Sequence, residues 1–88
     1  NIKNSVNFPD CSAMRMGVAR LCIVNENIPN MVGQITAILA EANINIVELV
    51  NKSRDTLAYN IIDIDSKVSK SVLNDVSSIS GIISVRLL

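Results

Sequence analysis

The sequence contains no histidine and no tryptophan, and only two cysteines, Cys11 and Cys22. Without histidine, the Ser–His and Cys–His nucleophile pairs of enzymes cannot form. The two cysteines do not make a Cys-x-x-Cys pair, so too few ligands remain for a zinc site. The three glycines are scattered, which excludes a glycine-rich phosphate loop. We therefore expect no catalytic residue and no metal site, and we interpret both cysteines as reduced thiols of a cytoplasmic protein.

An excess of charge is also missing, because eight basic residues balance eight acidic ones. A neutral chain with one tyrosine and one phenylalanine lacks the positive charge and the stacking aromatic rings that nucleic-acid binding requires. No apolar run approaches the roughly 20 residues of a membrane span. We therefore expect neither a nucleic acid nor a membrane as partner. The first residue is not methionine, and we interpret the chain as an excised domain of a longer protein.

Aliphatic residues are plentiful, since 49% of the chain is hydrophobic, and this predicts a folded domain. Residues 1–18 are polar and aperiodic and are expected to be a linker from a parent catalytic region, whereas residues 19–88 are expected to form one domain. Alternating or continuous apolar runs predict strands at residues 19–24, 44–50, 57–64 and 83–87. Apolar stripes with helical spacing predict helices from Pro29–Asn30 to Asn43 and from Asp65 or Ser66 to Ser80–Gly81.

The order of these elements is βαββαβ. Two helices with one apolar stripe each can cover only one face of a four-stranded antiparallel sheet, so we predict an α+β fold, the ferredoxin-like two-layer sandwich. Right-handed crossovers place the first and third strands in the centre of the sheet and the other two at its edges. The second strand, Ile44–Val50, has no proline, lysine or obvious bulge, and we expect a homodimer through this edge.

The sheet face turned away from the helices is expected to be apolar as well. It is either an ordinary half-solvated face or a surface that a partner or parent domain covers. The residues expected on it are Val24, Val47, Leu49, Tyr59 and Ile61. We expect Arg20 to be a surface charge. Asp63 and Asp65, two residues apart on the third strand, are expected to be solvated surface carboxylates.

The segment from Asn25 to Asn30, which joins the first strand to the first helix, is the candidate binding site. The first turn of a helix offers N–H donors and the positive end of the helix dipole, so it can hold a carboxylate. Carboxamides of Asn25, Asn27 and Asn45 would add uncharged donors and acceptors for the other groups of a free amino acid. In a dimer through the second strand, Asn45 of one chain could face Asn25 and Asn27 of the other. Alternatively, these residues only cap and turn a chain that contains eleven asparagines.

Residues 19–88 resemble the ACT domain, a regulatory module that binds amino acids. The motif extends from Glu26 to Ile35 (ENIPNMVGQI) and continues from Leu39 to Ile46 (LAEANINI). The tail at residues 4–9 (NSVNFP) and the ending at residues 85–88 (VRLL) make the chain similar to the C-terminal end of the D-3-phosphoglycerate dehydrogenase family.

The resemblance implies feedback control. In this family the domain binds L-serine, the end product of the pathway, between paired domains, and serine inhibits the dehydrogenase. The family's serine contacts fall on Asn25, Asn27 and Asn45, with Asn25 in the place of a histidine, and we add Asn30 and Met31 as candidate ligand residues. Asn30 stands where the family usually has glycine, and asparagine tolerates a positive φ, so we expect the turn to survive.

The resemblance also implies that the NAD cofactor and the catalytic residues belong to the catalytic domains of the parent, so this segment has no cofactor or activity of its own. Two alternatives stay open. One is a structural pairing module that has lost ligand binding. The other is an ACT domain of another protein of amino-acid metabolism, with a different ligand.

Overall fold

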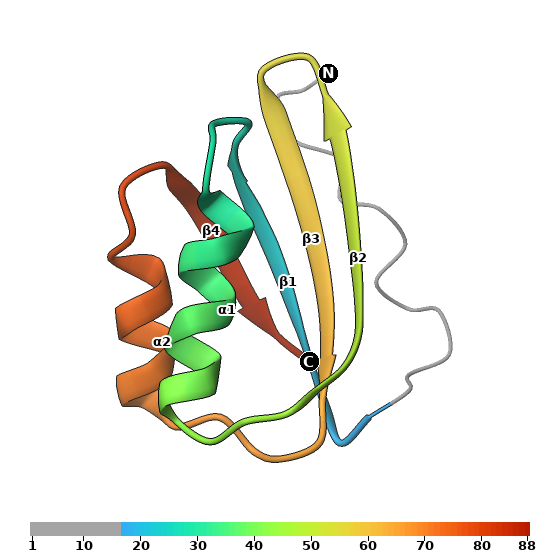
Figure 1. Ribbon diagram of the computed structural model, residues 1–88, viewed down its shortest axis with the longest axis vertical. Helices are drawn as coiled ribbons and strands as arrows, with labels where there is room; N and C mark the ends of the chain where they lie inside the picture. The colour runs from blue at the N-terminus through green and yellow to red at the C-terminus, as the bar shows by residue number, and fades with distance from the viewer. Residues whose placement is uncertain (1–16) are drawn as a thin grey trace.

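Four strands and two helices follow one another in the predicted βαββαβ order (Figure 1). The computed structural model describes residues 17–88. Most of the predicted linker, together with Cys11, lies outside the described residues. The elements are β1 (Ala19–Glu26), α1 (Met31–Glu41), β2 (Ile46–Arg54), β3 (Leu57–Ile64), α2 (Lys70–Ser77) and β4 (Ile82–Leu87).

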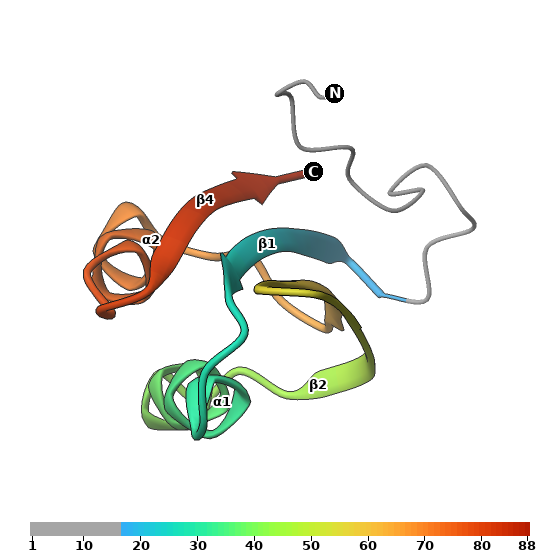
Figure 2. The ribbon, with the colours of Figure 1, turned by 90° about the horizontal axis from the view of Figure 1, so that it is seen from above.

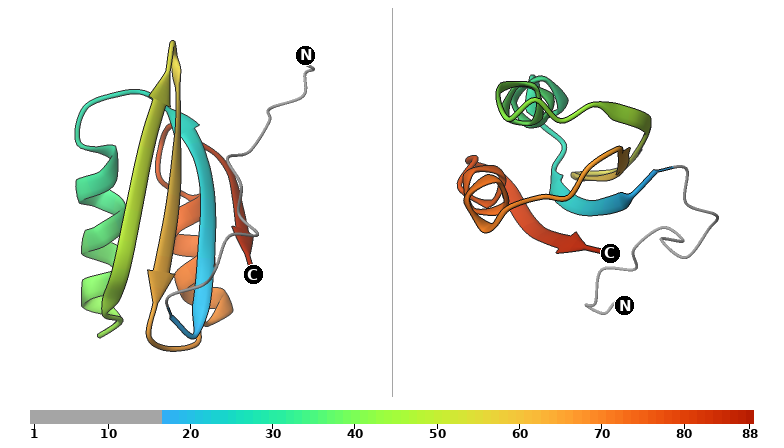
Figure 3. Two further views of the ribbon diagram at one scale, coloured as in Figure 1. Left: turned by 90° about the vertical axis from the view of Figure 1, so that its right-hand side faces the viewer. Right: turned by 90° about the horizontal axis from the view of Figure 1, so that it is seen from below.

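The strands form one antiparallel sheet in the order β2-β3-β1-β4. β1 and β3 are central and β2 and β4 are at the edges, as predicted. Both helices lie on the same face of the strongly twisted sheet (Figures 2 and 3). The prediction of a ferredoxin-like two-layer sandwich is therefore confirmed. Neither helix among residues 17–88 is long and apolar enough to cross a membrane.

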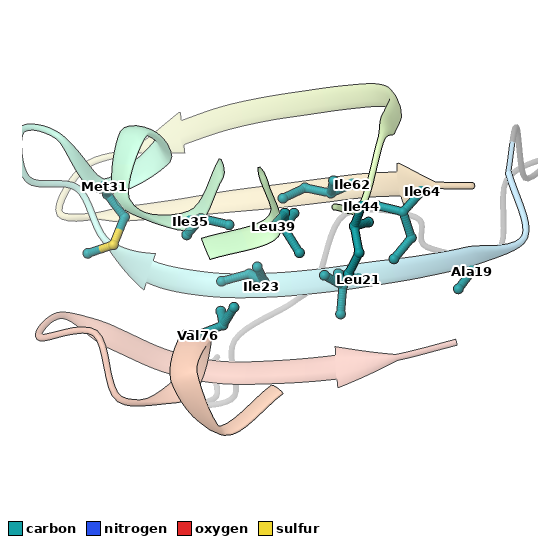
Figure 4. Packing of buried hydrophobic residues seen from close by; sticks show 10 residues of the cluster. All are labelled: Ala19, Leu21, Ile23, Met31, Ile35, Leu39, Ile44, Ile62, Ile64 and Val76. Atoms are coloured by element: carbon teal, nitrogen blue, oxygen red, sulfur yellow. The ribbon is translucent and has the colours of Figure 1, made fainter. Parts of the chain in front are cut away.

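The core fills the space between the sheet and the helices, as Figure 4 shows. Leu21 and Ile23 alternate along β1 and point into it, and both are fully buried. Ile35 and Leu39 of α1 meet them at helical spacing. The remaining members of this cluster are Ala19, Met31, Ile44, Ile62, Ile64 and Val76.

The C-terminal end of α1 confirms that Asn43 closes this helix. Asn43 has φ 59°, the left-handed conformation that stops a helix. The Asn43 N–H donates to the carbonyl of Ala40 (3.0 Å), and the Ile44 N–H donates to the carbonyl of Leu39 (2.9 Å). This pair of bonds is the Schellman motif, and it turns the buried Ile44 onto the core beside Leu39.

The second helix begins later than either residue predicted for its start. Its N-cap is Ser69, whose Oγ accepts a hydrogen bond from the Val72 N–H at 3.2 Å. Asp65 is unsuited to this role because its carboxylate accepts hydrogen bonds from Asn45. The helix also ends early, at Ser77, so Gly81 (φ 100°) belongs to the turn into β4 and not to the helix end.

The edge strand β2 differs from the prediction in length and in regularity. It continues to Arg54 and so includes Lys52. A register shift lies between Ile46 and Glu48, where β2 advances two residues against one residue of β3. Such a bulge changes which side chains face the core. Ile46 and Leu49 both pack against the core cluster, so the predicted outward position of Leu49 is wrong, as is the expectation of an edge without a bulge.

The outer face of the sheet is unevenly buried. Val24 is 1% exposed and Cys22 is fully buried, Tyr59 and Ile61 are half-buried, and Val47 at the bulge is 47% exposed. The expectation that Arg20 and Asp63 are surface charges is wrong. Both are at most 4% exposed and form a two-pronged ion pair, from Arg20 Nε to Asp63 Oδ1 at 2.6 Å and from Arg20 Nη2 to Asp63 Oδ2 at 2.9 Å.

Candidate functional site

A hollow of about 180 Å³ lies at the N-terminal end of α1. At this end of the sheet, the β1–α1 loop approaches the β2–β3 turn (Figure 1). This volume is large enough to admit several waters or a ligand of the size of a small amino acid. Its lining residues are Asn25, Asn27, Ile28, Asn30, Met31, Val32, Gly33, Asn51 and Ala58.

Asn25 lies near the end of β1 and is 1% exposed. Its Nδ2 donates to the carbonyl of Glu26 at 2.8 Å, and its Oδ1 accepts a hydrogen bond from Asn60 Nδ2 at 2.7 Å. The pairing of β1 with β4 also shifts register between Val24 and Asn25. The two hydrogen bonds hold the Asn25 carboxamide in one orientation beside the hollow.

Asn27 ties the β1–α1 loop to the β2–β3 turn. Its N–H donates to the carbonyl of Thr56 at 2.8 Å, and its Nδ2 donates to the carbonyl of Asp55 at 3.3 Å. Among residues 17–88, no group donates a hydrogen bond to the side-chain oxygen of Asn27. Asn27 can therefore offer an acceptor to a ligand while its donor fixes the loop.

Asn30 is the N-cap of α1, and its φ of 65° confirms that this residue accepts the left-handed conformation expected for the position. Its side chain makes no capping hydrogen bond, and the first turn contains no acidic residue. A Cβ on Gly33 would collide with Asn30 Oδ1, so the glycine makes room for this side chain above the first turn. The positive end of α1 is therefore not neutralised by a side chain of its own turn, and it suits an anionic group.

We expect Asn30→Ala to lower the free energy of unfolding by about 1 kcal/mol, because alanine pays the full cost of the left-handed conformation. Asn30→Gly should leave the stability unchanged or raise it, since glycine adopts this conformation without strain. Chemical denaturation of the two variants measures both effects. An Asn30→Gly protein less stable than Asn30→Ala would contradict this view of the turn.

Met31 lines the hollow and also belongs to the core cluster (Figure 4), and it is 3% exposed. A Cβ on Gly81 would come within 2.7 Å of Met31 Cε and 3.0 Å of Ile28 Cδ1. Gly81 thus lets both side chains pack closely against the turn into β4. This packing positions the apolar side of the hollow.

Asn45 does not join the other predicted residues within one chain. It lies just before β2, and the α1–β2 connection is at the end of the sheet opposite to the β1–α1 loop (Figure 1). Its Nδ2 donates to Asp65 Oδ2 at 3.2 Å and its N–H donates to Asp65 Oδ1 at 3.3 Å. The structure therefore brings Asn25, Asn27, Asn30 and Met31 together and leaves Asn45 apart.

Asn51 and Asn60 are two polar residues near the hollow that the sequence analysis did not identify. They are direct partners in the pairing of β2 with β3, and Asn51 Nδ2 donates to Asn60 Oδ1 at 2.7 Å. A two-residue turn at Asp55 and Thr56 pairs Asn51 with Asn60, whereas the predicted second strand ended at Val50 and so did not include Asn51.

Comparison with known proteins gives relatives that align with almost the whole chain, although no family model matches. The chain is 30% identical over 86 residues to D-3-phosphoglycerate dehydrogenase of Haemophilus influenzae and 33% identical over 87 residues to the Escherichia coli enzyme. Each alignment covers 97% of this chain but 21% of the relative. The chain thus spans about a fifth of the length of these relatives and matches their C-terminal region.

Solved structures show the same fold. The ACT domain of GTP pyrophosphokinase from Chlorobium tepidum superposes with a TM-score of 0.68, covering 80% of this chain and 95% of that one at 23% identity. The regulatory subunit of aspartate kinase from Thermus thermophilus superposes with a TM-score of 0.67, covering 86% of this chain and 53% of that one at 12% identity. Sequence and fold together support a C-terminal ACT domain similar to that of the D-3-phosphoglycerate dehydrogenases.

Proposed function

We propose that this chain is the regulatory domain of a D-3-phosphoglycerate dehydrogenase and that it binds L-serine or a similarly small amino acid. One observation carries the proposal most directly. Four residues selected from the sequence, Asn25, Asn27, Asn30 and Met31, line one hollow at the N-terminal end of α1. The relatives supply the biochemical context, since they are dehydrogenases to whose C-terminal region the chain is similar.

The groups around the hollow suit the chemistry of a free amino acid. The first-turn N–H groups of α1 and the helix dipole favour the carboxylate. The side-chain oxygen of Asn27 can accept a hydrogen bond from an ammonium or hydroxyl group. Ile28 and Met31 form an apolar side that limits the ligand to a short side chain.

A second copy of the chain is part of the proposal, because Asn45 can reach a hollow only from another chain. Antiparallel pairing of two β2 edges about a two-fold axis places the start of one strand beside the end of the other. Asn45 of one chain then approaches the hollow of its partner. The edge position of β2 and the exposed Val47 support pairing through Ile44–Val50, and the bulge restricts the registers in which it can occur.

Regulation then follows from linkage between the ligand and the arrangement of the catalytic domains. L-serine inhibits the parent only if it binds the inhibited arrangement more tightly than the active one. A ligand held between two chains stabilises one relative position of those chains. The proposed partners of this domain are accordingly a second copy and the NAD-dependent catalytic domains of its own parent.

Calorimetric titration of the 88-residue chain with L-serine, glycine and other small amino acids tests the proposal. We expect saturable heat with L-serine and a rise in the thermal unfolding midpoint, because a ligand that binds only the folded state stabilises it. Saturation by another amino acid and not by serine would identify a different ligand for the domain. No heat and no thermal shift with any amino acid at millimolar concentration would contradict ligand binding and favour a structural pairing module.

A further inference from the structure

Three carboxamides form a row across the helix-facing side of the sheet. Asn60 is paired with Ile23 of the core, Asn51 is paired with Asn60, and Asn25 lies two residues after Ile23 on β1. Asn25 and Asn60 are each 1% exposed. Burying a carboxamide costs free energy unless its polar atoms find partners, so the hydrogen bonds along this row determine how each amide is oriented.

The carbonyl of Glu26 sets the direction of the row because a carbonyl oxygen can only accept. Asn25 must therefore direct its NH₂ group at Glu26 (2.8 Å), which leaves its Oδ1 on the side of Asn60. Asn60 must then present its NH₂ to Asn25 (2.7 Å) and its Oδ1 to the next residue. Asn51 in turn must donate its NH₂ to Asn60 (2.7 Å). Each amide is held in one of its two possible orientations by its neighbour.

The direction of these hydrogen bonds leaves the Oδ1 of Asn51 as an acceptor at the end of the row. Asn51 lines the hollow, and among residues 17–88 its side chain makes no hydrogen bond other than the one it donates to Asn60. Its Oδ1 is therefore available to a donor. The first-turn N–H groups of α1, which favour an anion, border the same hollow.

We propose that Asn51 Oδ1 accepts a hydrogen bond from the ammonium group of the bound amino acid, and that Asn60 is a positioning residue that keeps this oxygen turned toward the ligand. The inference rests on the proposed function. It adds the protein group that recognises the ammonium of the ligand, and so distinguishes an α-amino acid from the same carboxylic acid without the amine. The carboxylate is held at the helix end and the ammonium at the sheet.

The test compares L-serine with 3-hydroxypropanoate, which keeps the carboxylate and the hydroxyl but lacks the ammonium. Calorimetry on the full 88-residue chain gives the affinity ratio of the two ligands. We expect the wild-type chain to prefer L-serine, and Asn51→Ala to reduce that preference about tenfold or more, because a hydrogen bond to a charged group is lost for L-serine alone. Ser53→Ala is the matched control, since Ser53 is an exposed residue two positions further along β2 that is absent from the lining, and it should leave the ratio unchanged.

Asn60→Leu separates positioning from stability. Without Asn60, the Asn51 amide is no longer fixed, so the preference for L-serine should fall although Asn51 is intact. If Asn60 had a structural role alone, Asn60→Leu would lower the thermal unfolding midpoint and leave the ratio of the affinities for the two ligands at its wild-type value.

The outcomes distinguish this inference from the function on which it rests. If the wild-type chain binds L-serine and Asn51→Ala keeps the wild-type ratio, the role of Asn51 is wrong and serine binding stands. If the wild-type chain binds no amino acid, both are wrong. A reduced ratio in Asn51→Ala with an unchanged ratio in Ser53→Ala supports both.

Discussion

Replacing Asp63 with asparagine should lower the free energy of unfolding by about 3–5 kcal/mol, the cost of breaking a buried ion pair by removing the charge of one partner. Arg20 is 4% exposed and Asp63 is 2% exposed, and the guanidinium contacts both carboxylate oxygens. Asparagine keeps the shape of the side chain but removes the negative charge. A small domain has about 5–15 kcal/mol of stability in total, so this variant should unfold far more readily than the wild type.

Urea denaturation followed by circular dichroism measures this loss. The matched control is Asp65→Asn, because Asp65 is an exposed carboxylate two residues away and should tolerate the change within about 1 kcal/mol. The double variant Arg20→Met with Asp63→Leu removes both charges and should recover much of the stability. If Asp63→Asn unfolds at the wild-type urea concentration, the ion pair is not a buried element of the fold.

Replacing Asn45 with alanine should weaken L-serine binding about tenfold or more while the chain stays folded and dimeric. The expected loss is that of a hydrogen bond to a charged group of the ligand, supplied from the second chain. The effect on stability should be small, since the bonds between Asn45 and Asp65 lie at the exposed surface. Calorimetry gives the affinity, and sedimentation velocity gives the mass of the same sample.

Asn74→Ala is the control for this prediction. Asn74 is an exposed asparagine on α2, and its recorded hydrogen bonds use its backbone carbonyl, so removing the carboxamide should affect neither binding nor dimer formation. An Asn45→Ala chain that is still dimeric and binds L-serine with wild-type affinity would remove Asn45 from the site. The proposed register of the two chains would then be wrong as well.

Local signals in the sequence predicted much of the fold. The alternation of Leu21 and Ile23 with polar or small neighbours identified the core side of β1, and Asn43 marked the end of α1 because few residues tolerate its left-handed conformation. Asn30 could be assigned a positive φ for the same reason. These features depend on residues close in sequence, so a pattern of a few positions is sufficient to predict them.

The errors arose where contacts between distant residues decide the structure. The bulge in β2 is not apparent from its composition, because Val47 and Leu49 are both apolar and only the pairing with β3 decides which of them faces the core. Arg20 and Asp63 are 43 residues apart, and their ion pair depends on the register of β1 with β3.

The candidate site was predicted in part for the same reason. Asn25, Asn27 and Asn30 belong to one short segment, so their proximity followed from the sequence. Asn51 and Asn60 reach the row of carboxamides only through strand pairing, and they were missed. Asn45 was named as a contact from a second chain, and its place at the far end of the sheet agrees with that geometry but does not test it.

Sedimentation equilibrium with and without L-serine tests most directly whether two copies of this chain hold an amino acid between them. Because a ligand that contacts both chains binds the dimer more tightly than the monomer, L-serine should lower the dimer dissociation constant, whereas glycerol at the same concentration should not. A chain that sediments as a monomer at every concentration, with or without L-serine, would contradict the account.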